Sequence, residues 1–139
     1  MTRIAIVGSG YMGGGIAQVF ALAGHDVILA DVTAEIAASN LERVRAETAQ
    51  FETQGLYPPG ATVTNTARVT AAQSLEAAVA DAEFIEEAVP ERIDIKHATL
   101  RRISEANATA VLGSNTSTIS IATLSETVVD PARFLGVHF

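Results

Sequence analysis

Cysteine is absent from this 139-residue sequence, so it can form neither a disulfide nor a thiolate metal site, and we expect no bound metal. Basic residues are also scarce: nine Lys and Arg stand against 16 Asp and Glu, giving a net charge of −7. A nucleic-acid partner would need a basic face to neutralise phosphates, so we exclude that class. There is no signal-peptide pattern and no apolar run near the roughly 18 residues of a membrane span, so we expect a soluble, cytoplasmic protein.

Almost half of the residues, 48%, are hydrophobic, which is enough for the core of one domain over residues 1–139. Strand-like apolar runs alternate with helix-compatible segments. This alternation predicts a doubly wound α/β fold with a mostly parallel sheet. The six expected strands lie near Ile4–Val7, Val27–Ala30, Arg68–Ala71, Phe84–Glu87, Ala110–Ser114 and Phe134–His138.

A long helical excursion is expected after the second strand. Apolar residues recur at helical spacing between Thr33 and Gln54, and Gly55 with Pro58-Pro59-Gly60 ends this element. Shorter helices are predicted at Leu75–Val79 and at Ile93–Ala106.

A dinucleotide-binding fingerprint, GSGYMG, follows the first strand and opens a helix-compatible run at Ile16–Leu22. Gly8 permits a sharp turn, Gly10 lets a pyrophosphate approach the backbone, and Gly13 lets the helix pack closely on the strand. Asp31 ends the second strand, where a carboxylate accepts hydrogen bonds from ribose hydroxyls and repels a 2′-phosphate. The expected cofactor is therefore NAD rather than NADP.

Polar side chains follow three further strands. They lie in Glu87-Ala88-Val89-Pro90-Glu91 with Lys96 after it, in Ser114-Asn115-Thr116-Ser117, and in Gly136-Val137-His138-Phe139. In a doubly wound sheet, ligands bind at the carboxyl ends of the strands. We therefore expect these three segments to converge on one crevice. Each has a simpler interpretation alone: a charged strand end for Glu86-Glu87, helix capping for Ser114–Ser117, and a packed or surface histidine for His138.

The candidate chemistry is the oxidation of a secondary alcohol. Such a reaction needs a base that takes the hydroxyl proton while hydride leaves the same carbon, and an imidazole does this near neutral pH. His138 is the candidate base, Ser117 can hold the substrate oxygen, and the Asn115 amide can hold the nicotinamide end. His25 and His97 are interpreted as ordinary structural or solvated residues.

Over essentially its whole length the sequence resembles the nucleotide-binding domain of the L-3-hydroxyacyl-CoA dehydrogenases. The resemblance rests on GxGxMGxGIA at Gly8–Ala17, EAVxE with the later lysine at Glu87–Lys96, SNTS at Ser114–Ser117 and GxHF at Gly136–Phe139. It implies that His138 is the catalytic base and that Ser117 binds the substrate oxygen. The residues expected to bind the cofactor are Gly8, Gly10, Tyr11, Met12, Gly13, Asp31, Ala88, Glu91, Lys96 and Asn115.

The resemblance also implies a second, all-helical domain that closes the substrate site and forms a homodimer, and a glutamate that orients the histidine. Neither is in this sequence, so we expect the chain to be the front part of a longer protein that binds NAD and turns over poorly alone. The implied substrate is a 3-hydroxyacyl thioester of CoA or of an acyl carrier protein. Between residues 32 and 95 there is no lysine, which weakens the case for free CoA thioesters.

Two other functions remain open at this point. One is a non-catalytic NAD-binding or redox-sensing module, which would need neither His138 nor Ser117. The other is a different Rossmann 3-hydroxyacid dehydrogenase of the 6-phosphogluconate-like group, which shares a similar GxGxMG but uses a lysine on its second domain.

Overall fold

The computed structural model describes every residue from Met1 to Phe139. Six strands form one sheet in the order β3-β2-β1-β4-β5-β6, and every pairing is parallel. This confirms the predicted doubly wound fold in a single domain. The strands are β1 (Arg3–Val7), β2 (Asp26–Ala30), β3 (Val69–Ala71), β4 (Phe84–Glu87), β5 (Val111–Ser114) and β6 (Phe134–Gly136).

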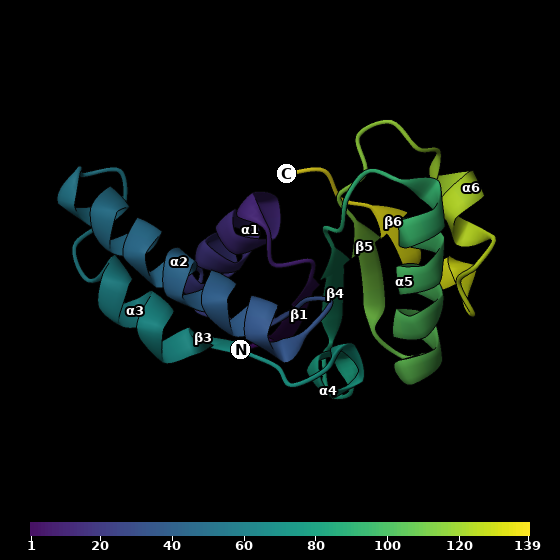
Figure 1. Ribbon diagram of the computed structural model, residues 1–139, viewed down its shortest axis with the longest axis horizontal. Helices are drawn as coiled ribbons and strands as arrows, with labels where there is room; N and C mark the ends of the chain where they lie inside the picture. Colours follow the sequence, from purple (N-terminus) through teal and green to yellow (C-terminus); the bar gives the residue numbers. More distant parts are fainter.

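Helices cover both faces of the sheet, with α1, α2 and α3 on one side and α4, α5 and α6 on the other (Figure 1). A single 3₁₀ turn, η1 (Pro131–Arg133), precedes β6. The helices are α1 (Tyr11–Leu22), α2 (Ala34–Thr53), α3 (Ala61–Arg68), α4 (Leu75–Val79), α5 (Ile93–Ala106) and α6 (Ile121–Ser125).

The hydrophobic core has two layers because successive strand residues point to opposite faces. In β1, Ile4 and Ile6 pack on the α1 side, whereas Ala5 and Val7 pack against α4 and α5. A parallel strand covered on both faces therefore needs a continuous apolar run. The strand sequences have this pattern, and it explains why they are recognisable before the structure is known.

The structure corrects several predicted boundaries. The sixth strand ends at Gly136, so His138 lies in the segment after the strand and not within it. Arg68 ends α3 instead of beginning β3. The helices α3 and α6 were not predicted at all.

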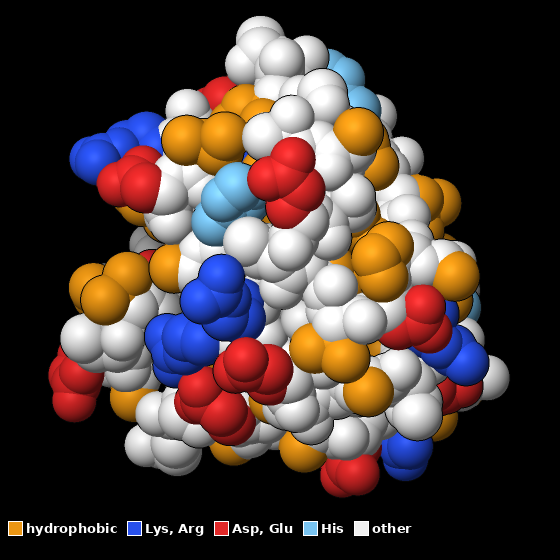
Figure 2. Space-filling model, turned by 90° about the vertical axis from the view of Figure 1, so that its right-hand side faces the viewer, with side chains coloured by type: hydrophobic (Ala, Val, Ile, Leu, Met, Phe, Trp, Pro, Cys, Tyr) orange, Lys and Arg blue, Asp and Glu red, His pale blue; other side chains and the backbone are white.

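The surface is mixed in charge. The face formed around α5 and α6 shows basic and acidic side chains next to one another, without a continuous basic area (Figure 2). Arg102, for example, pairs with Glu76 at 2.7 Å, and Arg92 pairs with Asp94 at 2.7 Å. None of the helices is both long and apolar enough to cross a membrane.

Candidate functional site

The strand order reverses between β1 and β4, and a cavity of about 890 Å³ opens beside the carboxyl ends of the strands. This is where a doubly wound sheet binds its ligands. Among the predicted site residues, those that line the cavity are Gly8, Gly10, Tyr11, Met12, Asp31, Ala88, Glu91, Asn115, Ser117 and His138. The three polar segments therefore do converge, as their positions after neighbouring strands predict.

The glycine loop is shaped by close contacts between backbones. Gly8 has φ of +100°, and a Cβ there would lie 2.6 Å from the carbonyl group of Ala88. A Cβ on Gly13 would lie 1.8 Å from the Gly8 oxygen, so Gly13 packs helix against strand without lining the cavity. Gly10 has nothing within 4 Å of its Cβ position and begins α1 without a side-chain cap. The N–H groups at this helix start are thus open to an anion.

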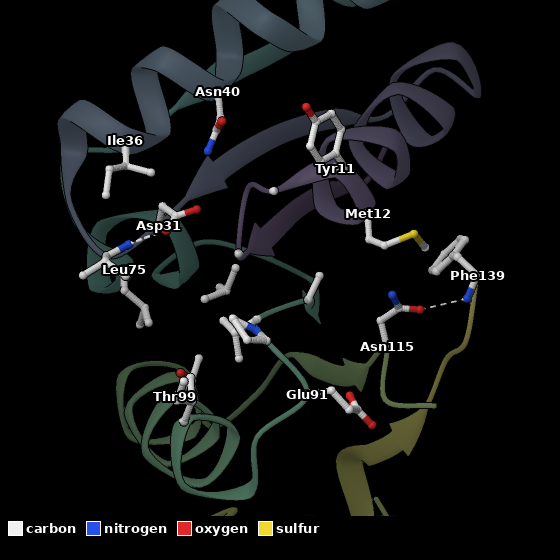
Figure 3. A pocket seen from close by; sticks show the side chains of 18 of the residues that line it. Tyr11, Met12, Asp31, Ile36, Asn40, Leu75, Glu91, Thr99, Asn115 and Phe139 are labelled. Atoms are coloured by element: carbon white, nitrogen blue, oxygen red, sulfur yellow. Dashed lines mark hydrogen bonds between the residues drawn. The ribbon is translucent and has the colours of Figure 1, made fainter. Parts of the chain in front are cut away.

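Asp31 projects from the end of β2 into the cavity and is fixed by its neighbours (Figure 3). Its Oδ2 accepts hydrogen bonds from the Ser9 amide at 2.8 Å and the Ser9 hydroxyl at 2.6 Å, while Oδ1 accepts from the Val32 amide at 2.8 Å. A carboxylate has about four acceptor sites, so about one remains for a ligand. Asn40 of α2 supports the arrangement by donating to the Ser9 hydroxyl at 2.9 Å.

Figure 3 shows how the cavity extends from Asp31, Ile36 and Leu75 at one end to Asn115 and Phe139 at the other. Several lining residues were not among the predicted site residues: Ile36, Asn40, Leu75, Val89, Ile95, Thr99 and Arg102. The helical positions of Ile36 and Asn40 one turn apart could have indicated a common face toward the glycine loop. The others depend on how α4 and α5 pack.

Lys96 does not line the cavity. Its side chain is only 1% exposed, and Nζ donates to both oxygens of Glu87, at 2.8 and 3.0 Å. Glu91 Oε2 lies 3.4 Å from the same nitrogen, and Ser114 donates to Glu87 at 2.6 Å. Lys96 is therefore the buried counter-ion of two carboxylates, Glu87 at the end of β4 and Glu91 in the segment after it. Its expected contact with the cofactor remains a prediction.

Ser117 and His138 lie together at the cavity edge, although 21 residues separate them. The Ser117 Oγ is 3.0 Å from Nε2 of His138, and both side chains are exposed. Asn115 Oδ1 accepts a hydrogen bond from the Phe139 amide at 3.0 Å, which holds the segment carrying His138 against the end of β5. A hydroxyl and an imidazole thus meet at the edge of the cavity that the glycine loop also lines, and an imidazole there can act as a base.

Two carboxyl groups in this region have shifted pKa values of opposite sign. Burial alone would raise the pKa of Glu91, but hydrogen bonds from Thr116, Thr118 and Ser117 and the nearby Lys96 charge lower it to about 2. Burial, followed by the negative charge of Glu87, raises the pKa of Glu86 to about 8. Both Glu86 and Glu87 are fully buried, so this strand end is not a solvated pair of charges: Glu87 pairs with the buried Lys96.

Taken together, the parallel sheet, the glycine loop at a helix start and the acidic end of β2 define an NAD-binding Rossmann domain. The chain belongs to the 3-hydroxyacyl-CoA dehydrogenase NAD-binding domain family, whose model matches residues 3–139. This confirms the predicted family and cofactor.

Known proteins similar to the chain carry related names. It is 32% identical over 138 residues to a 3-hydroxybutyryl-CoA dehydrogenase of Bradyrhizobium diazoefficiens, covering 99% of this chain and 47% of that protein. It is 34% identical to an L-carnitine dehydrogenase of Streptomyces griseus, covering 98% and 40%. An (S)-3-hydroxybutyryl-CoA dehydrogenase structure from Ralstonia eutropha superposes with a TM-score of 0.90 at 27% identity, covering 100% and 49%. The chain therefore spans about half the length of such relatives.

Proposed function

We propose that this chain is the nucleotide-binding part of an NAD-dependent dehydrogenase that oxidises the 3-hydroxyl of a 3-hydroxyacyl thioester to the 3-oxo form. The observation that carries the proposal is the 3.0 Å contact between Ser117 Oγ and His138 Nε2 at the edge of the cavity that holds the glycine loop. A module that only sensed NAD would need no such pair.

The residues fit the cofactor. The open side of Gly10 leaves room for a pyrophosphate, and Asp31 lies where a ribose would reach it. When bound, NAD supplies the hydride acceptor. Asn115 is then placed to hold the nicotinamide end, on the side of the cavity where it accepts a hydrogen bond from the Phe139 amide.

His138 takes the proton in the proposed reaction. As the C3–H bond of the substrate breaks, its electron pair leaves as hydride, the C–O bond becomes a carbonyl, and the hydroxyl proton passes to the imidazole. Ser117 positions the substrate oxygen within reach of the same nitrogen. In this chain His138 has a hydrogen-bond partner at Nε2 and none at Nδ1, so its ring is held from one side only. We therefore expect slow turnover from these 139 residues alone.

The proposal is tested by calorimetric titration with NADH and NADPH, followed by an assay of NADH oxidation by acetoacetyl-CoA at high protein concentration. We expect NADH to bind and NADPH to bind far more weakly. His138→Ala should abolish the remaining turnover without changing NADH affinity, whereas His25→Ala, remote from the cavity, should change neither. Equal turnover by His138→Ala and the unmodified chain would contradict the proposed base.

A second substrate class, a 3-hydroxy acid without CoA, is favoured by the charge of the cavity. Arg102 is its one basic lining residue besides His138, and Glu76 already binds that guanidinium. The two arginines of α2 are paired as well, Arg43 with Glu47 and Arg45 with Glu42. Few cations are thus free for the phosphates of CoA. Comparing acetoacetyl-CoA with a small 3-hydroxy acid such as L-carnitine, the substrate named for the Streptomyces griseus relative, separates the two classes.

A further inference from the structure

We propose that Glu91 is a positioning residue: one of its carboxylate oxygens fixes the turn that carries Ser117, and thereby the contact between Ser117 and His138. The inference takes the roles of Ser117 and His138 from the proposed function. It adds a separate task for Glu91, which the resemblance to the family assigns only to the cofactor.

The turn is built around a single oxygen atom. Glu91 Oε1 accepts hydrogen bonds from Thr116 Oγ1 at 2.5 Å, from the Ser117 amide at 3.0 Å, and from the amide and hydroxyl of Thr118 at 3.0 and 3.1 Å. Three successive residues therefore point donors at one carboxylate. Figure 3 shows Glu91 on the same side of the cavity as Asn115, which begins this segment.

Only the ends of the turn are held by other contacts. It spans the residues between β5 and α6, where no strand ladder continues. Thr116 is buried and Ile119 packs against the core, but the side chains of Ser117 and Thr118 between them are exposed. Within the turn, Ile119 N–H donates to Thr116 Oγ1, the same hydroxyl that is bound to Glu91. Without the carboxylate, the amides of Ser117 and Thr118 would turn to water, and the position of Ser117 Oγ would be free to change.

Glu91 is itself held in place by a buried cation. Its second oxygen, Oε2, lies 3.4 Å from the Lys96 ammonium, which is buried and bound to Glu87 on β4. The arrangement thus links helix α5, the end of β4 and the turn after β5. A carboxylate is required because it combines an acceptor for several donors with the charge that pairs with Lys96. The low pKa of Glu91 agrees with a group that stays ionised in this role.

The effect passes to His138 through Ser117. Because Ser117 Oγ contacts Nε2 of the imidazole at 3.0 Å, a displaced turn changes the surroundings of that nitrogen without any change to His138 itself. A purely structural role would lower stability but leave the imidazole environment of the folded protein as it was. The two roles are therefore distinguishable in folded variants.

The test follows the ring nitrogens of His138 by NMR in the ¹⁵N-histidine-labelled chain, across a pH titration, with His138→Ala to assign the signals. Ser117→Ala defines the signals of an imidazole that has lost its partner. We expect Glu91→Ala to shift the His138 signals in the same direction by at least half as much, and the double variant to match Ser117→Ala. Glu91→Gln, which keeps an acceptor oxygen but loses the charge, should give an intermediate shift and covers the case in which Glu91→Ala does not fold.

Glu52→Gln is the matched control. Glu52 also clamps a turn, accepting from the Gly60 amide at 2.7 Å and from Thr62, but it lies at the end of α2 and does not line the cavity. Its replacement should leave the His138 signals unchanged. Unchanged His138 signals in folded Glu91→Ala or Glu91→Gln would overturn the positioning role. NADH oxidation by acetoacetyl-CoA, assayed with the unmodified chain and with His138→Ala, tests the proposed function separately, since that result does not depend on the His138 signals.

Discussion

Asp31 is the side chain that most directly controls the choice between NAD and NADP. Asp31→Asn keeps an acceptor for Ser9 but removes the charge that repels a 2′-phosphate. Losing charge-assisted hydrogen bonds of about 1.5–3 kcal/mol should lower NADH affinity about 10- to 150-fold, while NADPH binding improves relative to NADH. Calorimetric titration with both nucleotides measures this. Asp26→Asn, at the opposite end of the same strand, should leave both affinities unchanged. A similar effect from both variants would contradict the role of Asp31 in distinguishing NAD from NADP.

Glu86 makes stability depend on pH. Its pKa in the folded protein is raised from 4.5 to about 8, so the folded chain keeps a proton that the unfolded chain loses in this interval. The stabilising contribution is fully present below pH 4.5 and is lost as the pH rises through about 8. Glu86→Gln carries no titrating proton. We expect the urea midpoint of the unmodified chain to fall relative to Glu86→Gln between about pH 5 and about pH 8.5.

The exposed Glu105 provides the comparison for this measurement. Glu105→Gln removes a carboxyl group without touching the core, so its urea midpoint should follow the unmodified chain at every pH. If Glu86→Gln also follows it in parallel, the buried carboxyl does not hold its proton in the folded state.

At the scale of elements, the approach of α1 to β1 depends on Gly13. A Cβ there would lie 1.8 Å from the Gly8 oxygen, which belongs to a backbone turn with φ of +100° and cannot move aside cheaply. We expect Gly13→Ala to destabilise the chain by about 2–3 kcal/mol, and to weaken NADH binding because the glycine loop is displaced. Denaturant unfolding and NADH titration measure the two effects.

Gly15 in the same helix is the natural control, because nothing lies within 4 Å of its Cβ position. Gly15→Ala should stabilise the chain by about 0.5–1 kcal/mol through the higher helix propensity of alanine. If Gly13→Ala and Gly15→Ala changed the stability and the NADH affinity equally, the close contact between Gly13 and the Gly8 oxygen would not be important for either.

The elements were predictable to different degrees, for physical reasons. Strands β1 and β2 were predictable because strands buried on both faces of a parallel sheet need a continuous apolar run. Each observed strand begins one residue earlier than predicted. Helix α3 gives little signal: it buries only Ala61 and Asn65, and Thr62, Val63 and Thr64 are β-branched residues with low helix propensity.

The residues of the candidate site were also predictable to different degrees. Gly8, Gly10 and Asp31 follow from spacing alone, because the fold fixes where a glycine turn and an acidic strand end must stand. The contacts of Glu91 do not, because they join it to residues 25 to 27 positions later in the sequence. The burial of Lys96 likewise depends on how α5 docks on β4, and a lone lysine in a helix normally predicts a solvated side chain.

For the whole molecule, the net charge of −7 acts on an anionic cofactor before any contact forms. Asp31 and Glu91 add negative charge at the cavity, against the single paired Arg102. Affinity must therefore come from local contacts, chiefly the amides at the start of α1, working against a repulsive field. The long-range repulsion should therefore affect mainly the rate of NADH association, whereas the local contacts should determine its affinity.

Salt screens the long-range repulsion more than the short-range contacts. We expect the association rate of NADH, measured by stopped-flow fluorescence, to rise about 2- to 5-fold between roughly 20 and 200 mM NaCl. Glu105→Lys combined with Glu126→Lys, both exposed and outside the cavity, changes the net charge from −7 to −3 and should flatten this dependence without altering the contacts. A rate that instead falls with salt would mean that the positive end of α1 dominates the field outside the cavity, because screening then weakens an attraction.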